Sequence, residues 1–114
     1  MQASQREFLE SLLTTASPSG FETEGQRVWI DYVESFADEV TTDDYGNAVA
    51  VHNGSGEGPE IAFSGHADEI GFIVRDIDDH GFIRISRIGW AERTGSQGQH
   101  VTSHAGPGPA PGVT

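Results

Sequence analysis

The 114-residue sequence contains no cysteine and no lysine. The absence of cysteine excludes disulfides, thiolate metal sites and cysteine nucleophiles. Six arginines are outnumbered by eighteen acidic residues, and the formal net charge is -12 at pH 7. Because a nucleic-acid-binding protein needs a basic surface to neutralise phosphates, we expect no nucleic-acid partner.

Long hydrophobic runs are also missing. No stretch approaches the roughly 20 consecutive apolar residues that a membrane-spanning helix needs, and the N-terminus lacks the pattern of a signal peptide. We therefore expect a cytoplasmic protein with no membrane partner. The acidic, lysine-free composition favours a halophilic source, because salt screens the repulsion between like charges. An ordinary acidic bacterial protein is the alternative.

Two helical patterns open the chain. Ser4 and Glu7 have the spacing of a capping box, and the apolar residues after them recur at helical intervals until Pro18 ends the helix. Ser19 and Glu22 form a second such box, which predicts a longer helix. The inner face of that helix is predicted to consist of Phe21, Gly25, Val28, Trp29, Tyr32, Val33 and Phe36.

Strand patterns follow the helices. Four runs have the composition or alternation of strands: 40–43, 47–52, 71–75 and 82–88. The first two are joined by a predicted turn at Tyr45–Gly46, and the last two predict a hairpin with one buried face. A further short strand is expected at 100–103, whereas the glycine- and proline-rich end, 106–114, is not expected to close a core.

The stretch 61–71 carries the clearest chemical signal. An apolar segment, predicted to be a strand, leads into His66, which is followed closely by two carboxylates. Since side chains alternate along a strand, His66 and Asp68 would lie on one face, and Glu69 would point away as a structural residue. A carboxylate can hold an imidazole in one tautomer while the other ring nitrogen binds metal. His66 is therefore a candidate metal ligand, and a polar residue at a strand end is the alternative.

The pattern changes from helices and strands to hairpins near residues 68–70. This change predicts a domain boundary, with one domain at 1–68 and a second at 69–114. The other histidines lie in predicted strand ends or turns and are expected to be surface residues: His52, His80, His100 and His104.

Four motifs occur in order along the chain: Ser17-Pro18-Ser19-Gly20-Phe21-Glu22, 43–50, 65–74 and 79–82. Together they resemble the start of the tetrahedral (deblocking, glutamyl) aminopeptidase family. The members of this family are dinuclear metallo-aminopeptidases and have also been called cellulase M. The likeness covers essentially the whole chain, which we identify as an N-terminal part of such a protein with a haloarchaeal-like composition.

The resemblance implies an α/β fold, in which two helices and short strands begin a catalytic domain. The start of a β-rich, PDZ-like or barrel dimerisation domain would follow. It implies that His66 ligates one of two divalent ions, zinc or cobalt, and that Asp68 supports this ligand. It further implies an enzyme that forms homo-oligomers and hydrolyses N-terminal residues from short peptides.

The sequence also departs from the family. The family's remaining metal ligands and its glutamate general base have no counterpart in this chain, and Trp90 stands where the family usually has glycine. We therefore expect an N-terminal fragment that is inactive on its own. The alternatives are a truncated, non-catalytic remnant and a small assembly or binding module that pairs with a full-length homologue.

Overall fold

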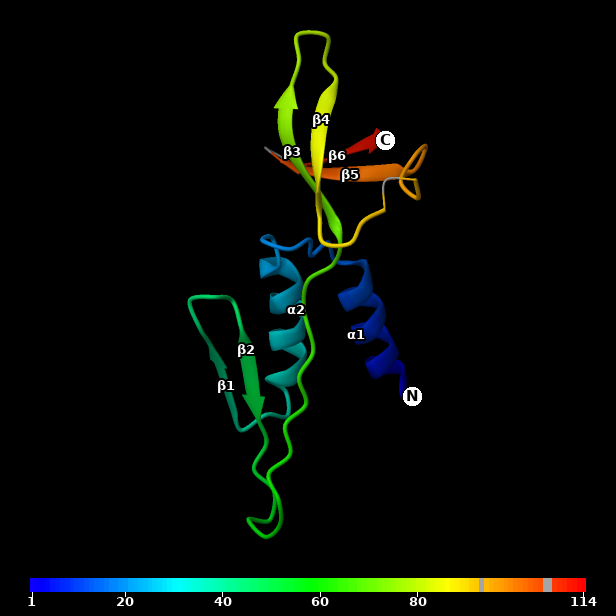
Figure 1. Cartoon of the computed structure of the whole chain (residues 1–114). Coiled ribbons are helices and arrows are strands. Elements are labelled where there is room, and N and C mark those ends of the chain that lie inside the picture. The colour runs from blue at the N-terminus through cyan, green and yellow to red at the C-terminus, as the bar shows by residue number, and fades with distance from the viewer. Residues whose placement is uncertain (93, 106–107) are drawn as a thin grey trace. The chain divides into compact units, whose positions relative to one another are not determined.

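The computed structural model describes residues 1–92, 94–105 and 108–114. These residues form two helices and three two-stranded antiparallel sheets (Figure 1). The predicted α/β class is confirmed. The chain divides into two compact units, Met1–Glu69 and Ile70–Thr114, and both helices belong to the first.

Both predicted helices are present, but neither starts at its predicted capping box. Helix α1 spans Ala3–Thr14, and its first turn is closed by the N–H of Gln2, which donates to Gln5 Oε1 at 2.9 Å. Helix α2 spans Thr23–Val33, and its N-cap is Glu22. Ser19 therefore lies too far before α2 to cap it.

A tight turn separates Ser19 from the helix. The N–H of Phe21 donates to the carbonyl of Pro18 at 2.7 Å, and Gly20 has a φ of 88°. A positive φ at the third residue is the mark of a type II turn, which favours glycine there. Glu22 Oε1 also accepts the N–H of Gly20 at 2.5 Å. The glutamate of the predicted capping box therefore closes this turn.

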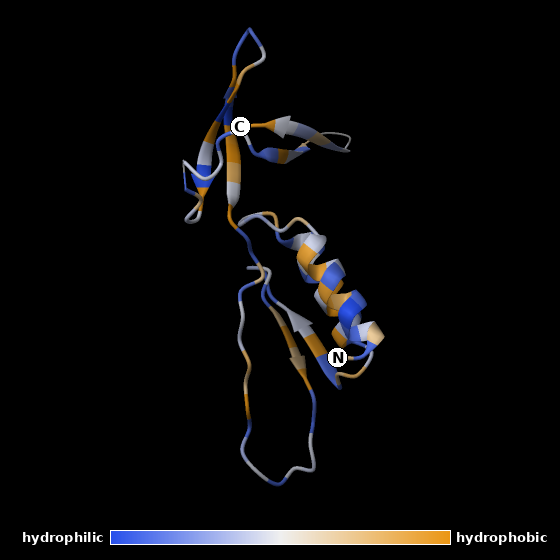
Figure 2. Cartoon of the chain, turned by 90° about the vertical axis from the view of Figure 1, so that its right-hand side faces the viewer, coloured by the Kyte–Doolittle hydropathy of each residue, from blue (hydrophilic) through white to orange (hydrophobic). Residues whose placement is uncertain are grey.

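An aromatic contact joins the two helices. Phe8 of α1 stacks on Tyr32 of α2 with ring centroids 3.9 Å apart and planes within 9°, and Tyr32 meets Phe36 edge-on at 5.5 Å. On the same helix α2, Gly25 and Val33 are buried. Apolar and hydrophilic residues alternate along the helices (Figure 2). The inner face predicted for the second helix is thus confirmed at its centre, while Phe36 remains 54% exposed.

The first hairpin agrees with the prediction. Strand β1, Glu39–Thr42, pairs with β2, Ala48–Val51, and the turn at Tyr45–Gly46 joins them. Asp43 Oδ1 accepts the N–H groups of Tyr45 and Asn47 at 2.9 Å each, and Oδ2 accepts from Asn47 Nδ2 at 2.7 Å. These bonds lower the pKa of the Asp43 carboxyl, with the Asn47 side chain as the largest cause.

The strand predicted before His66 is not formed. Residues 52–68 contain no strand, and Ile61 and Phe63 are 73% and 95% exposed. A strand needs a neighbour to bond its backbone groups. No backbone–backbone hydrogen bond between described residues involves 52–68, and only the next residue, Glu69, forms an isolated parallel bridge, to Pro18. The apolar run before His66 therefore lacks the partner that would make it a strand.

The second unit begins with the predicted hairpin. Strand β3, Gly71–Ile77, pairs with β4, Ile83–Ile88, with an irregularity between Val74 and Asp76. The expected buried face is wrong: no residue of either strand is buried, and Ile85 remains 42% exposed. Most of the alternating apolar side chains of the two strands are exposed.

The strand expected at 100–103 is confirmed as part of a third hairpin. Strand β5, His100–Ala105, pairs with β6, Gly108–Val113, which lies in the glycine- and proline-rich end; residues 106–107 lie outside the described residues. The pair formed by Gln99 and Thr114 is hydrogen-bonded, with Thr114 N donating at 3.2 Å. Because bonded and non-bonded pairs alternate, the prolines opposite Thr102 and His104 fall at non-bonded pairs. A missing N–H costs nothing there, so these prolines are tolerated in a strand.

Candidate metal-ligand site

His66 lies at the end of the irregular segment, and its ring is held in place through one nitrogen, Nδ1. His66 Nδ1 is 2.8 Å from the main-chain oxygen of Asp68 and 3.2 Å from its carboxylate oxygen Oδ1. A carbonyl oxygen only accepts hydrogen bonds, so Nδ1 is the donor, and in the neutral imidazole this places the lone pair on Nε2. The imidazole is 84% exposed, so Nε2 is accessible from solvent. The structure therefore presents one imidazole nitrogen in the form that binds metal.

Asp68 divides its carboxylate between two partners. Oδ1 lies near His66, and Oδ2 accepts a short hydrogen bond from the Ser19 hydroxyl. The Ser19 bond is the largest cause that lowers the pKa of the Asp68 carboxyl, and the hydrogen bond from His66 lowers it further, whereas partial burial opposes both. The carboxylate is thus kept ionised beside the imidazole.

The segment that carries Ser19 is joined to residues 67–69 like a short parallel ladder. Glu69 N donates to Ser17 O at 2.8 Å, and Ser19 N donates to Glu69 O at 3.3 Å. Two bonds from Ser17 reinforce it: Oγ donates to Ala67 O at 2.8 Å, and the N–H donates to Glu69 Oε1 at 2.9 Å. Glu69 has the structural position that the sequence suggested. Ser17 and Ser19 were missed as neighbours of the site, although both belong to a motif that carried the family resemblance.

The described residues supply too few ligands for a complete site. Among them, no group of three or more histidine, aspartate or glutamate side chains is placed to hold a metal ion. A bound divalent ion needs several protein ligands, with an open position for water if it is catalytic. His66 fits as one ligand with a supporting carboxylate and does not complete a coordination shell.

The remaining histidines lie away from this arrangement in the sequence. His52 follows β2 and approaches Asp38 at 3.3 Å, whereas His80 lies in the turn between β3 and β4. His100 and His104 lie on β5. These positions match the strand-end and turn locations expected for them.

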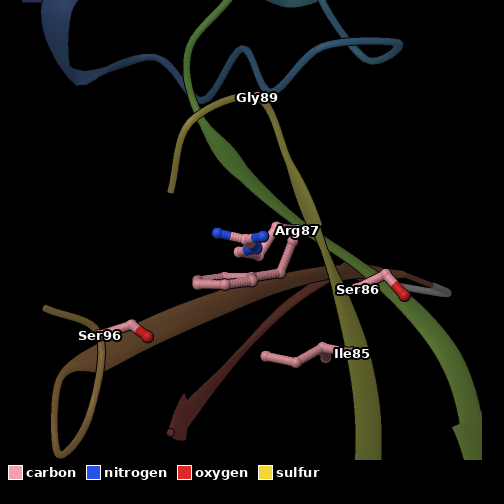
Figure 3. Close-up of a pocket in the computed structure, with 6 residues that line it drawn as sticks. Ile85, Ser86, Arg87, Gly89 and Ser96 are labelled. Carbon is pink, nitrogen blue, oxygen red and sulfur yellow. The ribbon is translucent and has the colours of Figure 1, made fainter. Parts of the chain in front are cut away.

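The second unit contains a shallow hollow of about 450 Å³ (Figure 3). It is lined by Phe72, Ile85, Ser86, Arg87, Gly89 and Ser96. No carboxylate or imidazole of a described residue lines it, and Arg87 Nη1 donates to the carbonyl of Ala91 at 3.2 Å. The hollow therefore lacks the groups of a hydrolytic centre. In the part of the chain that the structure describes, no helix has the length and apolarity to cross a membrane.

Two solved structures with folds similar to this chain are aminopeptidases. The chain is similar to the TET aminopeptidase of the marine sediment archaeon Thaumarchaeota archaeon SCGC AB-539-E09, with a TM-score of 0.91, 31% identity and coverage of 98% of this chain. It is also similar to aminopeptidase APDkam598 of Desulfurococcus kamchatkensis, with a TM-score of 0.86, 31% identity and coverage of 94%. Residues 46–114 match the M42 glutamyl aminopeptidase family. The chain belongs to this family.

Curated relatives agree with this assignment. The chain is 35% identical over 102 residues, 88% of its length, to the putative aminopeptidase FrvX of Escherichia coli strain K12. It is 34% identical over 84 residues, 73% of its length, to the lysyl aminopeptidase of Pyrococcus furiosus. The chain covers 28% of the first protein and 24% of the second. Its coverage of the two solved structures is 31% and 30%, so it spans less than a third of the length of these relatives.

Proposed function

We propose that this chain is the N-terminal portion of a metallo-aminopeptidase that removes N-terminal residues from short peptides. In this proposal, His66 ligates one of two divalent ions, zinc or cobalt, and Asp68 supports it. The observation that carries the proposal is the placement of the imidazole: Nδ1 is engaged by Asp68, which leaves Nε2 of the 84% exposed side chain as the nitrogen that would bind metal. Membership of the M42 family, which is metal-dependent, supports the same assignment.

The residues of this chain would perform only part of the reaction. Divalent ions, when bound, activate water and polarise the scissile carbonyl. His66 would bind through Nε2, and Asp68 would keep the proton on Nδ1 so that the ring holds one orientation. No residue of this chain is proposed as general base. The 114 residues by themselves are therefore proposed to be inactive.

The two domains are proposed to differ in role. Residues 1–68 would begin the catalytic domain, and residues 69–114 would begin a β-rich dimerisation domain of a homo-oligomeric enzyme. One observation favours the alternative of an assembly module that pairs with a full-length homologue. The second unit leaves large apolar side chains exposed, including Val74 at 46% and Ile85 at 42%, which are paired across the β3–β4 hairpin. Contiguous exposed apolar surface is a frequent mark of protein interfaces.

The acidic composition is proposed to reflect a salt-rich cytoplasm. A net charge of -12 on 114 residues implies strong self-repulsion at low ionic strength. Raising the salt concentration shortens the range of that repulsion. The chain should therefore unfold at a higher temperature as potassium chloride is raised into the molar range. A melting temperature that stays constant over this range would contradict the halophilic assignment.

Zinc titration tests the ligand assignment directly. The chain, labelled with ¹⁵N, is titrated with zinc while the ring signals of its histidines are followed by NMR. We expect Nε2 of His66 to respond first, and this response to disappear in His66→Ala. The matched control is His80→Ala, which removes a turn histidine and should leave the response unchanged. Zinc that perturbs all histidines alike would remove His66 from its proposed role.

Activity is tested separately. The chain is assayed on aminoacyl chromogenic substrates with zinc or cobalt in high salt. No turnover is expected from this chain alone. Turnover that is lost in His66→Ala would refute the proposal that the chain is inactive by itself.

A further inference from the structure

Ser19 occupies a position that its predicted role does not explain. It is not a helix cap, because α2 begins only at Thr23. Its hydroxyl instead donates to Asp68 Oδ2, 49 residues along the chain. Asp68 Oδ1, the other oxygen of the same carboxylate, lies 3.2 Å from His66 Nδ1. A line of hydrogen-bonded groups therefore runs from the turn at Ser19 through the carboxylate to the imidazole.

We propose that Ser19 is a positioning residue that sets the rotamer of Asp68 and thereby keeps the proton of His66 on Nδ1. This inference rests on the proposed role of His66 as a metal ligand and adds the group that prepares the ligand. A carboxylate that supports an imidazole works only when one oxygen faces the ring. The Ser19 hydroxyl occupies Oδ2, so Oδ1 is the oxygen that remains for His66.

The surroundings of Ser19 make its hydroxyl a fixed donor. The residue lies in the turn closed by Phe21 N and Pro18 O, and its own N–H donates to Glu69 O at 3.3 Å. The neighbouring Ser17 is only 6% exposed and is bonded to the 67–69 segment through both its N–H and its hydroxyl. The backbone on both sides of the Ser19–Asp68 contact is therefore held, and the hydroxyl adds only the final alignment of the carboxylate.

The main-chain oxygen of Asp68 also accepts from His66 Nδ1, at 2.8 Å. That bond alone favours the same tautomer, so removing Ser19 should weaken the preference and not abolish it. The side chain of Asp68 is 42% exposed, and without the serine its carboxylate can turn toward water. We therefore expect removal of the Ser19 hydroxyl to cost Nδ1 its carboxylate acceptor, Oδ1, while the main-chain oxygen of Asp68 remains.

The test measures the tautomer of His66 without any metal. Long-range ¹H–¹⁵N NMR on the labelled chain distinguishes a proton on Nδ1 from one on Nε2, and both from a doubly protonated ring. In the unsubstituted chain we expect the Nδ1-protonated form to dominate. In Ser19→Ala its ratio to the Nε2-protonated form should fall by a factor of about 3 to 10, the range given by the net contribution of one hydrogen bond.

Two further variants separate positioning from folding. Ser19→Thr keeps a hydroxyl and should restore the ratio. Ser35→Ala removes a hydroxyl that donates to Tyr32 O at 2.8 Å at the end of α2, and it should leave the ratio unchanged. The amide signal of Glu69, which bonds to Ser17, reports whether the ladder persists in each variant.

Each possible result supports or overturns the role of Ser19. An unchanged tautomer ratio in Ser19→Ala with the Glu69 signal in place overturns the proposal, as does an unsubstituted chain whose spectrum lacks the dispersion of a folded protein. If Ser19→Ala displaces the Glu69 signal as well, Ser19→Thr decides: failure to restore the ratio overturns positioning by the hydroxyl. These results are independent of zinc. A normal tautomer response without zinc binding at His66 would sink the proposed function while leaving the role of Ser19 standing.

Discussion

Replacing Gly25 by alanine should lower the free energy of unfolding, although this substitution in a helix usually raises it. This residue lies in α2 against Ser17, and a Cβ added to it would be 2.7 Å from Ser17 Oγ and 3.1 Å from Ser17 Cβ. Ser17 has little freedom to withdraw, because it bonds to Ala67 and Glu69 at 2.8 and 2.9 Å. Gly25→Ala should therefore force apart the helix and the segment that holds the candidate site.

Two opposing terms set the magnitude. Replacing glycine by alanine inside a helix normally stabilises a protein by about 1 kcal/mol. Forcing an extra methyl group into a packed contact costs about 1–3 kcal/mol. The sum is a loss of about 1 kcal/mol in the free energy of unfolding, opposite in sign to the usual effect of this substitution.

Urea unfolding followed by tryptophan fluorescence measures this change. Trp29 lies in α2, whereas Trp90 is 94% exposed and should change little in emission on unfolding. Asp31→Ala, at an exposed site of the same helix, is the control for helix propensity and should be neutral or slightly stabilising. Adding Ser17→Gly to Gly25→Ala removes both clashing atoms, so the double-mutant cycle should show a favourable coupling of about 1 kcal/mol.

Stabilisation would refute this reasoning. If Gly25→Ala raises the free energy of unfolding by the ordinary propensity gain, Ser17 yields to the new methyl group at no cost. The segment 17–19 would then be held less firmly than its hydrogen bonds indicate.

Three further outcomes follow from the packing, the turn and the strands. Phe8→Ala should lower the free energy of unfolding in urea by about 1–3 kcal/mol, less than for a fully buried phenylalanine, whereas Leu13→Ala, 72% exposed, should change it by less than about 0.5 kcal/mol. Asn47→Ala should raise the pKa of Asp43 toward its ordinary value, as followed by NMR of the carboxyl carbon. Because the native pKa of Asp43 is lowered, its stabilising effect is present above the ordinary pKa of about 3.9 and is lost as the pH falls through the native value. The loss on acidification should therefore be smaller in the variant. Ala110→Pro should remove an N–H from a hydrogen-bonded pair and disrupt the β5–β6 hairpin by about 1 kcal/mol or more, visible as lost amide dispersion in 100–113.

Local patterns predicted the elements that depend on local chemistry. The β1–β2 turn was found because Asp43, Gly46 and Asn47 meet its needs by themselves, through side-chain bonds and a φ of 83° at Gly46. The apolar faces of α1 and α2 followed from helical spacing, which includes Phe8 and Tyr32, whereas the contact between these two residues was not predicted. In both cases the residues that specify the feature lie within a few positions of it or on one periodic face.

One prediction was wrong because the same residue pattern fits two different local structures. Ser19 and Glu22 fit a capping box, but Gly20 takes a positive φ, and the resulting turn sends the serine to Asp68. Such a contact spans 49 residues and leaves no periodic trace in the sequence. The strand expected before His66 is absent for a different reason. An apolar run forms a strand only when a neighbouring strand can bond its backbone groups.

The candidate site has the hydrogen bonds that orient a metal ligand but, among the described residues, only one such ligand, His66. Metal ligands are commonly oriented by a second layer of hydrogen bonds, and here that layer is present around a single imidazole: the main chain and carboxylate of Asp68 engage Nδ1, and Ser19 engages the carboxylate. Such an arrangement costs conformational freedom before any metal is bound. It reduces the ordering that binding would otherwise require, because the ring already has the right tautomer. The supports of His66 are therefore encoded within the first 69 residues, independently of any ligands that lie elsewhere.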